Sequence, residues 1–190
     1  MKANFGSMSI TNNIERGCKT GLGGVNTFYL APYIKYTRTQ TTIVGQLLTV
    51  FPATSLFKVD AENVSFTETS SFEGGSEAWD QTFSFEFPRT AVGNELYTLL
   101  KRDYRVIYVD RNGNNRILGF KNGLESTNTN ETGVGHADLS GYRVTMTGKE
   151  DNQAYFISDI EAIGFVIGSN FVFEDSKNYT FEDDINFNFQ

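Results

Sequence analysis

The chain has 190 residues, of which 39% are hydrophobic, 14% aromatic and 21% charged, and it carries a net charge of −7 at pH 7. A chain of this length forms one domain and buries a core without disulfides or metals to hold it together. The acidic balance argues against a protein that wraps nucleic acid or lies on an anionic membrane, because both need clustered lysine and arginine side chains.

Cysteine and histidine occur once each, as Cys18 and His136. One cysteine excludes an intramolecular disulfide and the multi-cysteine zinc sites, and one histidine excludes the metal sites that use two. A nucleophilic Cys18 would need His136 as its base. A small residue in a glycine-rich loop and a hydrogen-bonded loop histidine are the simpler interpretations. No apolar run is long enough to span a membrane, and none near the start is typical of a signal peptide.

Residues 1–27 are rich in glycine, asparagine and serine, and we interpret them as an N-terminal arm. The stretch GCKTGLGG within them is not a P-loop. A P-loop requires a lysine directly after its second glycine and then a helix, whereas Lys19 follows Cys18 and a strand pattern follows the glycines. That pattern predicts a strand over residues 27–36, in which Pro32 marks an edge or a bend.

The next segment contains regular alternation of apolar and polar residues on both sides of a Gly-Gly turn. The apolar positions are Val64, Phe66 and Phe72 before the turn and Phe83, Phe85 and Phe87 after it. Serine, threonine and glutamate fill the positions between them. This period of two predicts a long antiparallel hairpin with one buried and one solvated face. The 17 phenylalanines and 9 tyrosines of the chain favour β structure in general.

Residues 90–103 contain the one convincing helix pattern of the chain. Apolar residues recur at helical spacing, namely Val92, Leu96, Leu99 and Leu100. Thr90 is placed to cap the N-terminus. The segments VIYVD and RILGF follow and flank a turn centred on Asn112 and Gly113, which predicts a second hairpin because Asn-Gly supplies the positive φ of a tight turn.

Residues 121–135 are polar and turn-rich, and we predict a loop there. GYRVTMTGKE alternates Tyr142, Val144 and Met146 with polar residues, which predicts a strand. YFISDI and GFVIG follow. Their pattern is compatible with strands and with short pieces around a turn.

The last residues alternate again, with Ile185, Phe187 and Phe189 between Asn186, Asn188 and Gln190. This is the pattern of an edge strand that needs a partner, and we predict that the three apolar residues form an oligomer interface. Pairing of this tail within its own subunit is the alternative.

Carboxylates gather in two places, which raises the question of glycoside hydrolysis or a bound cation. The first group is Glu62, Glu68, Glu73, Glu77, Asp80 and Glu86, and the second is Glu174, Asp175, Glu182, Asp183 and Asp184. Sugar-cleaving clefts are usually lined with tryptophan and tyrosine, and the chain has a single tryptophan. The acidic run before the tail lacks the glycine spacing of a calcium loop. We interpret both groups as solvated acidic faces and expect no enzyme activity, no catalytic residue, no metal and no cofactor.

These patterns predict a mainly β protein, an antiparallel β-sandwich or small barrel with one flanking helix and extended terminal arms. The predicted organisation is an arm over residues 1–27, a β-sandwich domain over residues 28–170 with the helix near residues 90–103, and a strand-like tail over residues 171–190.

This organisation resembles the tail-tube family of bacteriophages and related contractile machines. The resemblance rests on the alternating segment 62–88, the helix, and the segments VIYVDRNGNNRILGFKNGL and GVGHADLSGYRVTMTGKE, and it extends over roughly residues 28–170. These segments look like those of small structural proteins from phages of a Bacteroides-like host. The terminal segments are longer than a minimal tube protein needs, which points to a terminator, baseplate-proximal ring or head–tail adaptor as alternatives to the tube itself.

The resemblance implies a non-enzymatic virion protein, made in the host cytoplasm. Six copies of it would close into a ring, and the rings would stack on one another and on neighbouring tail or connector proteins. It also implies that DNA passes through the lumen without specific binding, which suits a chain of charge −7. A carbohydrate-binding β-sandwich module is the alternative from a different class, because tyrosines and loops rich in asparagine and threonine suit sugar recognition.

Overall fold

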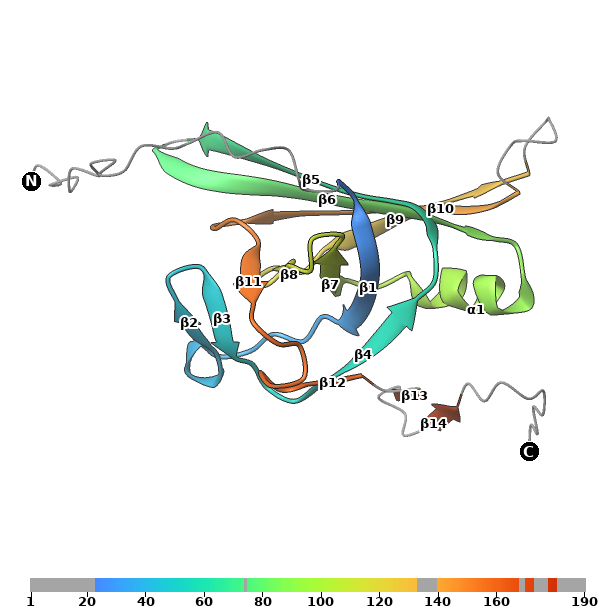
Figure 1. Ribbon diagram of the computed structural model, residues 1–190. Coiled ribbons are helices and arrows are strands. Elements are labelled where there is room, and N and C mark those ends of the chain that lie inside the picture. The colour runs from blue at the N-terminus through green and yellow to red at the C-terminus, as the bar shows by residue number, and fades with distance from the viewer. Residues whose placement is uncertain (1–22, 74, 133–139, 168–169, 173–177, 181–190) are drawn as a thin grey trace, which may run out of the picture.

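The computed structural model describes residues 23–73, 75–132, 140–167, 170–172 and 178–180 (Figure 1). One sheet contains eight strands: β1 (Val25–Pro32), β2 (Thr42–Val44), β3 (Leu47–Val50), β4 (Thr54–Val59), β7 (Tyr104–Asp110), β8 (Asn115–Leu118), β11 (Tyr155–Ile157) and β12 (Phe165–Ile167). Their order across the sheet is β12-β4-β1-β7-β8-β11-β3-β2, and the sheet curls into a half-barrel.

The second sheet contains four strands: β5 (Glu62–Glu73), β6 (Ser76–Pro88), β9 (Glu125–Glu131) and β10 (Gly141–Glu150). Their order is β5-β6-β10-β9, with antiparallel pairing throughout. The remaining elements are the short helix η1 (Arg38–Gln40), the helix α1 (Ala91–Leu99) and a ribbon of β13 (Asn170–Val172) and β14 (Asn178–Thr180). The mainly β class with two sheets and one short α-helix confirms the predicted fold class.

Two hydrophobic clusters lie on opposite faces of strand β7. Tyr104, Val106 and Tyr108 belong to the larger cluster, which fills the space between the two sheets, whereas Ile107 belongs to the smaller cluster inside the curl of the eight-stranded sheet. A strand that is covered on both faces carries apolar side chains at successive positions, which explains the run VIYV.

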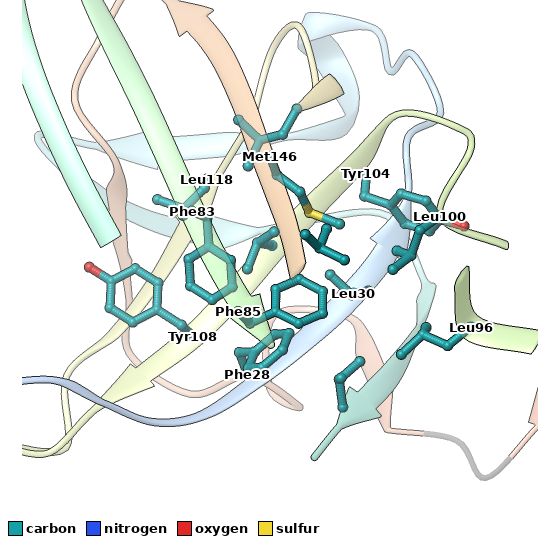
Figure 2. Close-up of a cluster of buried hydrophobic side chains, with 14 of the residues drawn as sticks. Phe28, Leu30, Phe83, Phe85, Leu96, Leu100, Tyr104, Tyr108, Leu118 and Met146 are labelled. Atoms are coloured by element: carbon teal, nitrogen blue, oxygen red, sulfur yellow. The ribbon is translucent and has the colours of Figure 1, made fainter. Parts of the chain in front are cut away.

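The larger cluster is built on the phenylalanines of strand β6 (Figure 2). Phe83 and Phe85 are fully buried and lie against Phe28 of β1, with ring centroids 5.0 and 4.9 Å apart. Met146 on the neighbouring strand β10 points into the same cluster (Figure 2). The alternation in this hairpin therefore reflects a real division between a core face and a solvent face, as predicted.

The alternation does not hold at the hairpin's end. Phe72 has the same parity as Val64 and Phe66, but its side chain is 78% exposed because the hairpin extends past the second layer of the sandwich (Figure 1). The sequence pattern reports the face of a strand but not where the layer beneath it ends.

Helix α1 is shorter than predicted, since it covers residues 91–99 rather than 90–103. Thr90 caps its N-terminus as predicted, because the Thr90 hydroxyl accepts a hydrogen bond from the Gly93 N–H at 3.0 Å. The other end is fixed by tertiary contacts. The Tyr104 hydroxyl donates to the Leu99 carbonyl at 2.8 Å, and side chains of β9 donate to the Leu100 carbonyl. These contacts satisfy carbonyl groups that a longer helix would have used internally.

Two expectations from the sequence need correction. The segment 121–135 was expected to be a loop but contains β9, whereas strands β2 to β4 lie in a segment for which the sequence analysis predicted no particular element. Pro32 does not mark an edge strand: β1 lies between β4 and β7, and Pro32 is its last residue. YFISDI and GFVIG do contain strands, namely β11 and β12, and β1 begins at Val25, inside the segment expected to be an arm.

The turn between β7 and β8 confirms the second predicted hairpin. Gly113 has φ +83°, and the Asp110 carboxylate accepts hydrogen bonds from the backbone N–H groups of Asn112 and Asn114 at 2.8 and 2.9 Å. Burial alone would raise the pKa of Asp110, but these bonds and that from the Asn114 side chain outweigh it and hold the pKa below its ordinary value.

We expect Gly113→Ala to lower the free energy of unfolding by about 1 kcal/mol, because a Cβ atom is disfavoured at positive φ. Gly23→Ala is the control, since Gly23 has no left-handed backbone and a methyl group added there would meet no atom within 4 Å beyond its chain neighbours. Equilibrium urea unfolding measures both. An equal loss in the two variants would show that the turn conformation does not set the effect.

Candidate assembly surface

The solvent face of the four-stranded sheet carries ranks of hydroxyl side chains that run across the strands. One rank joins four directly paired residues, Ser65, Ser84, Thr145 and Thr127. The Ser65 and Ser84 hydroxyl oxygens are 2.8 Å apart. Because alternate residues of each strand face the core, this surface is polar by the same period that buries the phenylalanines.

Charges lie around these hydroxyl ranks. The Arg143 guanidinium bridges two carboxylates, with Nε 2.7 Å from Glu86 and a terminal nitrogen 3.0 Å from Glu131. Hydrogen bonds from Asn63 and then from Arg143 hold the pKa of Glu86 below its ordinary value. Glu62 lies directly opposite Glu86, and Glu125 lies opposite Thr147.

Carboxylates outnumber cations on this face. Its described acidic side chains are Glu62, Asp80, Glu86, Glu125 and Glu131, and its cations are Arg143 and Lys149. The face therefore keeps a negative balance after its ion pairs are formed, which disfavours contact with another polyanion.

Both edge strands of this sheet have one side without a partner strand in the described part of the chain. There β5 pairs only with β6, and β9 pairs only with β10. An edge of this kind presents backbone N–H and C=O groups that another strand can pair with.

The edge strand β9 is held against the helix by its inward side chains. Ser126 and Asn128 both donate to the Leu100 carbonyl. The Asn128 side-chain oxygen is buried and has no hydrogen-bond partner among the described residues. The sequence analysis did not predict this strand because both of its faces carry polar residues. The one sequence signal for it is the Thr-x-Thr spacing that it shares with β10.

The edge strand β5 borders the part of the larger core that is least covered. Partly buried apolar residues gather there, on β1, β4 and β5 and the turn between the last two: Val25, Phe57, Ala61, Val64 and Phe66. A crevice of about 120 Å³ opens beside Val64 and is lined by residues 25–28 and 59–61.

Two buried charged residues, Arg105 and Glu150, escaped the sequence prediction. The Arg105 side chain is 2% exposed and lies over the rings of Tyr33, Tyr36 and Phe51, at 4.4, 4.9 and 5.5 Å from their centroids. Its Nε donates to the Phe120 carbonyl at 3.0 Å, whereas one terminal nitrogen has no partner among the described residues.

Glu150 is 5% exposed, interacts with Arg105, and accepts hydrogen bonds from the backbone N–H groups of Lys121 and Asn122 at 3.1 and 2.8 Å. Burial raises the pKa of Glu150, and those bonds and Arg105 oppose the rise. Burial lowers the pKa of Arg105. We assign this pair a structural role, because its contacts join β7, the turn after β8 and the end of β10.

Several residues singled out by the sequence lie outside the described part of the chain. They are Ile185, Phe187 and Phe189 of the predicted interface, Cys18, His136 and the acidic residues from Glu174 to Asp184. Among the hairpin carboxylates, Glu68 faces inward and accepts hydrogen bonds from the Gln81 side chain and the Ala154 N–H. The structure therefore gives Glu68 a role in joining β5 to β6 and to the segment before β11.

Within the described residues, no three histidine, cysteine, aspartate or glutamate side chains gather as a metal site would require. No helix in that part of the chain has the length and apolar content needed to cross a membrane. Comparisons with protein-family models, with curated proteins and with solved structures found no match.

Proposed function

We propose that this chain is a non-enzymatic structural protein of a phage tail, whose copies join into rings that stack into or cap a tail tube. The observation that carries the proposal is the four-stranded sheet, which combines a polar, net acidic face with two edges that are unpaired in the described part of the chain. The resemblance in the sequence adds the ring of six and the position in the virion.

The geometry supports a ring for a physical reason. When one edge of a subunit meets a different surface of the next, the contact is heterologous, and repeating it closes a ring if the rotation fits. Closure also removes sheet edges that would otherwise pair without limit. In such a ring the polar face can line the lumen, where carboxylates repel the phosphates of passing DNA.

Negative-stain imaging together with light-scattering mass over a concentration series tests this proposal. We expect rings or tubes of uniform width, whose rotational average gives the ring order. Because each copy carries a charge of −7, raising the salt concentration to about 0.15 M should promote assembly by screening repulsion. A strict monomer at every concentration contradicts the proposal, and a monomer that binds sugar would favour the binding-module alternative.

A further inference from the structure

The edge of β5 that has no partner strand in the described part of the chain has side chains on both faces that suit the addition of one more strand. Ser65 and Thr67 are exposed on its solvent face, whereas Val64 and Phe66 are only partly buried on its core face. Phe66 packs on Tyr108 of β7, with ring centroids 5.3 Å apart. A strand that pairs here would need apolar side chains towards the core and neutral polar side chains towards solvent.

The crevice beside Val64 gives this edge a place for a side chain. Val25, Val59, Ala61 and Val64 line it together with the polar residues Asn26, Thr27 and Asp60, and it opens where β1, β4 and β5 meet. A large apolar side chain there would cover the exposed border of the larger core, and apolar area removed from water stabilises at about 25 cal/mol per Å².

The last six residues of this sequence have the required pattern. Ile185, Phe187 and Phe189 share one parity, and the residues between them are uncharged amides. As a strand, six residues span about 20 Å, so the 12 residues of β5 are long enough to receive them. These six residues lie outside the described part of the chain, so the match is one of sequence pattern to edge geometry.

The position of β14 indicates which copy supplies the strand. Four residues, 181–184, separate β14 from this segment and span at most about 14 Å, whereas β14 lies across the molecule from the four-stranded sheet (Figure 1). We infer that residues 185–190 of one copy add a strand to this edge of β5 in a second copy, with one apolar side chain in the crevice beside Val64. This inference rests on the proposed assembly into rings and names the contact that joins neighbours.

Cross-linking between single cysteines tests which edge receives the segment. In a Cys18→Ser background, Asn188→Cys is combined with Thr67→Cys on β5 or, as the control, with Thr129→Cys on β9. Thr67 and Thr129 are both exposed on the solvent face of the sheet, at its two opposite edges. With a short bismaleimide, we expect covalent dimers and higher multimers for the Thr67 pair and at least tenfold fewer for the Thr129 pair. Equal yields, or a bridge within one chain, would overturn the inference.

A second measurement uses the full-length chain without cross-links. Phe187→Ser with Phe189→Ser should raise the concentration needed for assembly by about 100-fold, because two large apolar side chains lose their burial. Asn188→Ser is the matched control and should leave that concentration unchanged. If the wild-type chain assembles and the double variant assembles equally well, the tail contact is wrong but the proposed function stands. If the wild-type chain is a strict monomer, both are wrong.

Discussion

Phe83→Ala is expected to lower the free energy of unfolding by about 3–5 kcal/mol, which is a large share of the stability of a single domain. Phe83 is fully buried between the two sheets, with its ring 5.0 Å from that of Phe28 and 6.2 Å from that of Tyr108. Its loss leaves a cavity lined by rigid rings on two sheets, which have little freedom to close it. Equilibrium urea unfolding at low protein concentration measures the change.

The same hairpin offers the control. Phe72→Ala removes an identical side chain that is 78% exposed near the hairpin's end, and its effect should stay within about 0.5 kcal/mol. A loss at Phe72 as large as that at Phe83 would show that the projecting end packs against something else, and would contradict the division into a core part and an exposed part.

The contrast between these two phenylalanines shows what the sequence pattern predicts and where it stops. The period of two in residues 62–88 predicts the hairpin and its two faces, because a strand with one buried face must alternate. It assigned Phe72 to the buried face, since alternation carries no information about where the opposite layer ends. The fold class was predictable because most strands are flanked by turn signals such as Asn-Gly at the β7–β8 turn.

β9 shows the opposite case. It was predicted to be a loop because neither of its faces is apolar, and its inward side chains Ser126 and Asn128 donate hydrogen bonds to a carbonyl group more than twenty residues earlier in the chain. The order β6-β10-β9 is likewise fixed by pairing between distant segments. Local patterns cannot predict contacts of this kind, although these contacts decide which strands lie at the edges of the sheet among the described residues.

The candidate surface was predictable only in its parts. The serines and threonines on the solvent face of β5 and β6 follow from alternation, but the ranks that run on through Thr145 and Thr127 depend on the strand order. The predicted interface residues Ile185, Phe187 and Phe189 remain a prediction, and the structure contributes the edge on β5 and the crevice beside Val64 to which we assign them. The Arg105–Glu150 pair, separated by 45 residues, has no local signature at all.

Arg105→Met is expected to lower the free energy of unfolding at pH 7 by about 2–4 kcal/mol, because it removes a buried guanidinium that lies over three aromatic rings and donates a hydrogen bond to a carbonyl group. Methionine has a similar length and keeps much of the apolar contact with the rings of Tyr33, Tyr36 and Phe51. The Phe120 carbonyl loses its donor, and the buried carboxylate of Glu150 loses its nearby cation. Thermal or urea unfolding of the two proteins at pH 7 measures the difference.

The pH dependence of that loss identifies its cause. Burial holds the pKa of Glu150 in the folded chain above its ordinary value, and the loss of Arg105 should raise this pKa further. The folded state therefore binds more protons than the unfolded state between the ordinary pKa of a glutamate and the raised one, so stability falls as the pH rises through this window. The destabilisation by Arg105→Met should thus be smaller near pH 4 than at pH 7.

Combining Arg105→Met with Glu150→Gln should recover part of the stability at pH 7 and remove this pH dependence. The glutamine side chain is neutral, and its amide oxygen still accepts hydrogen bonds from the Lys121 and Asn122 N–H groups. A loss that is equal at both pH values and unaffected by Glu150→Gln would show that the two groups are not coupled, and that the aromatic contacts alone account for the role of Arg105.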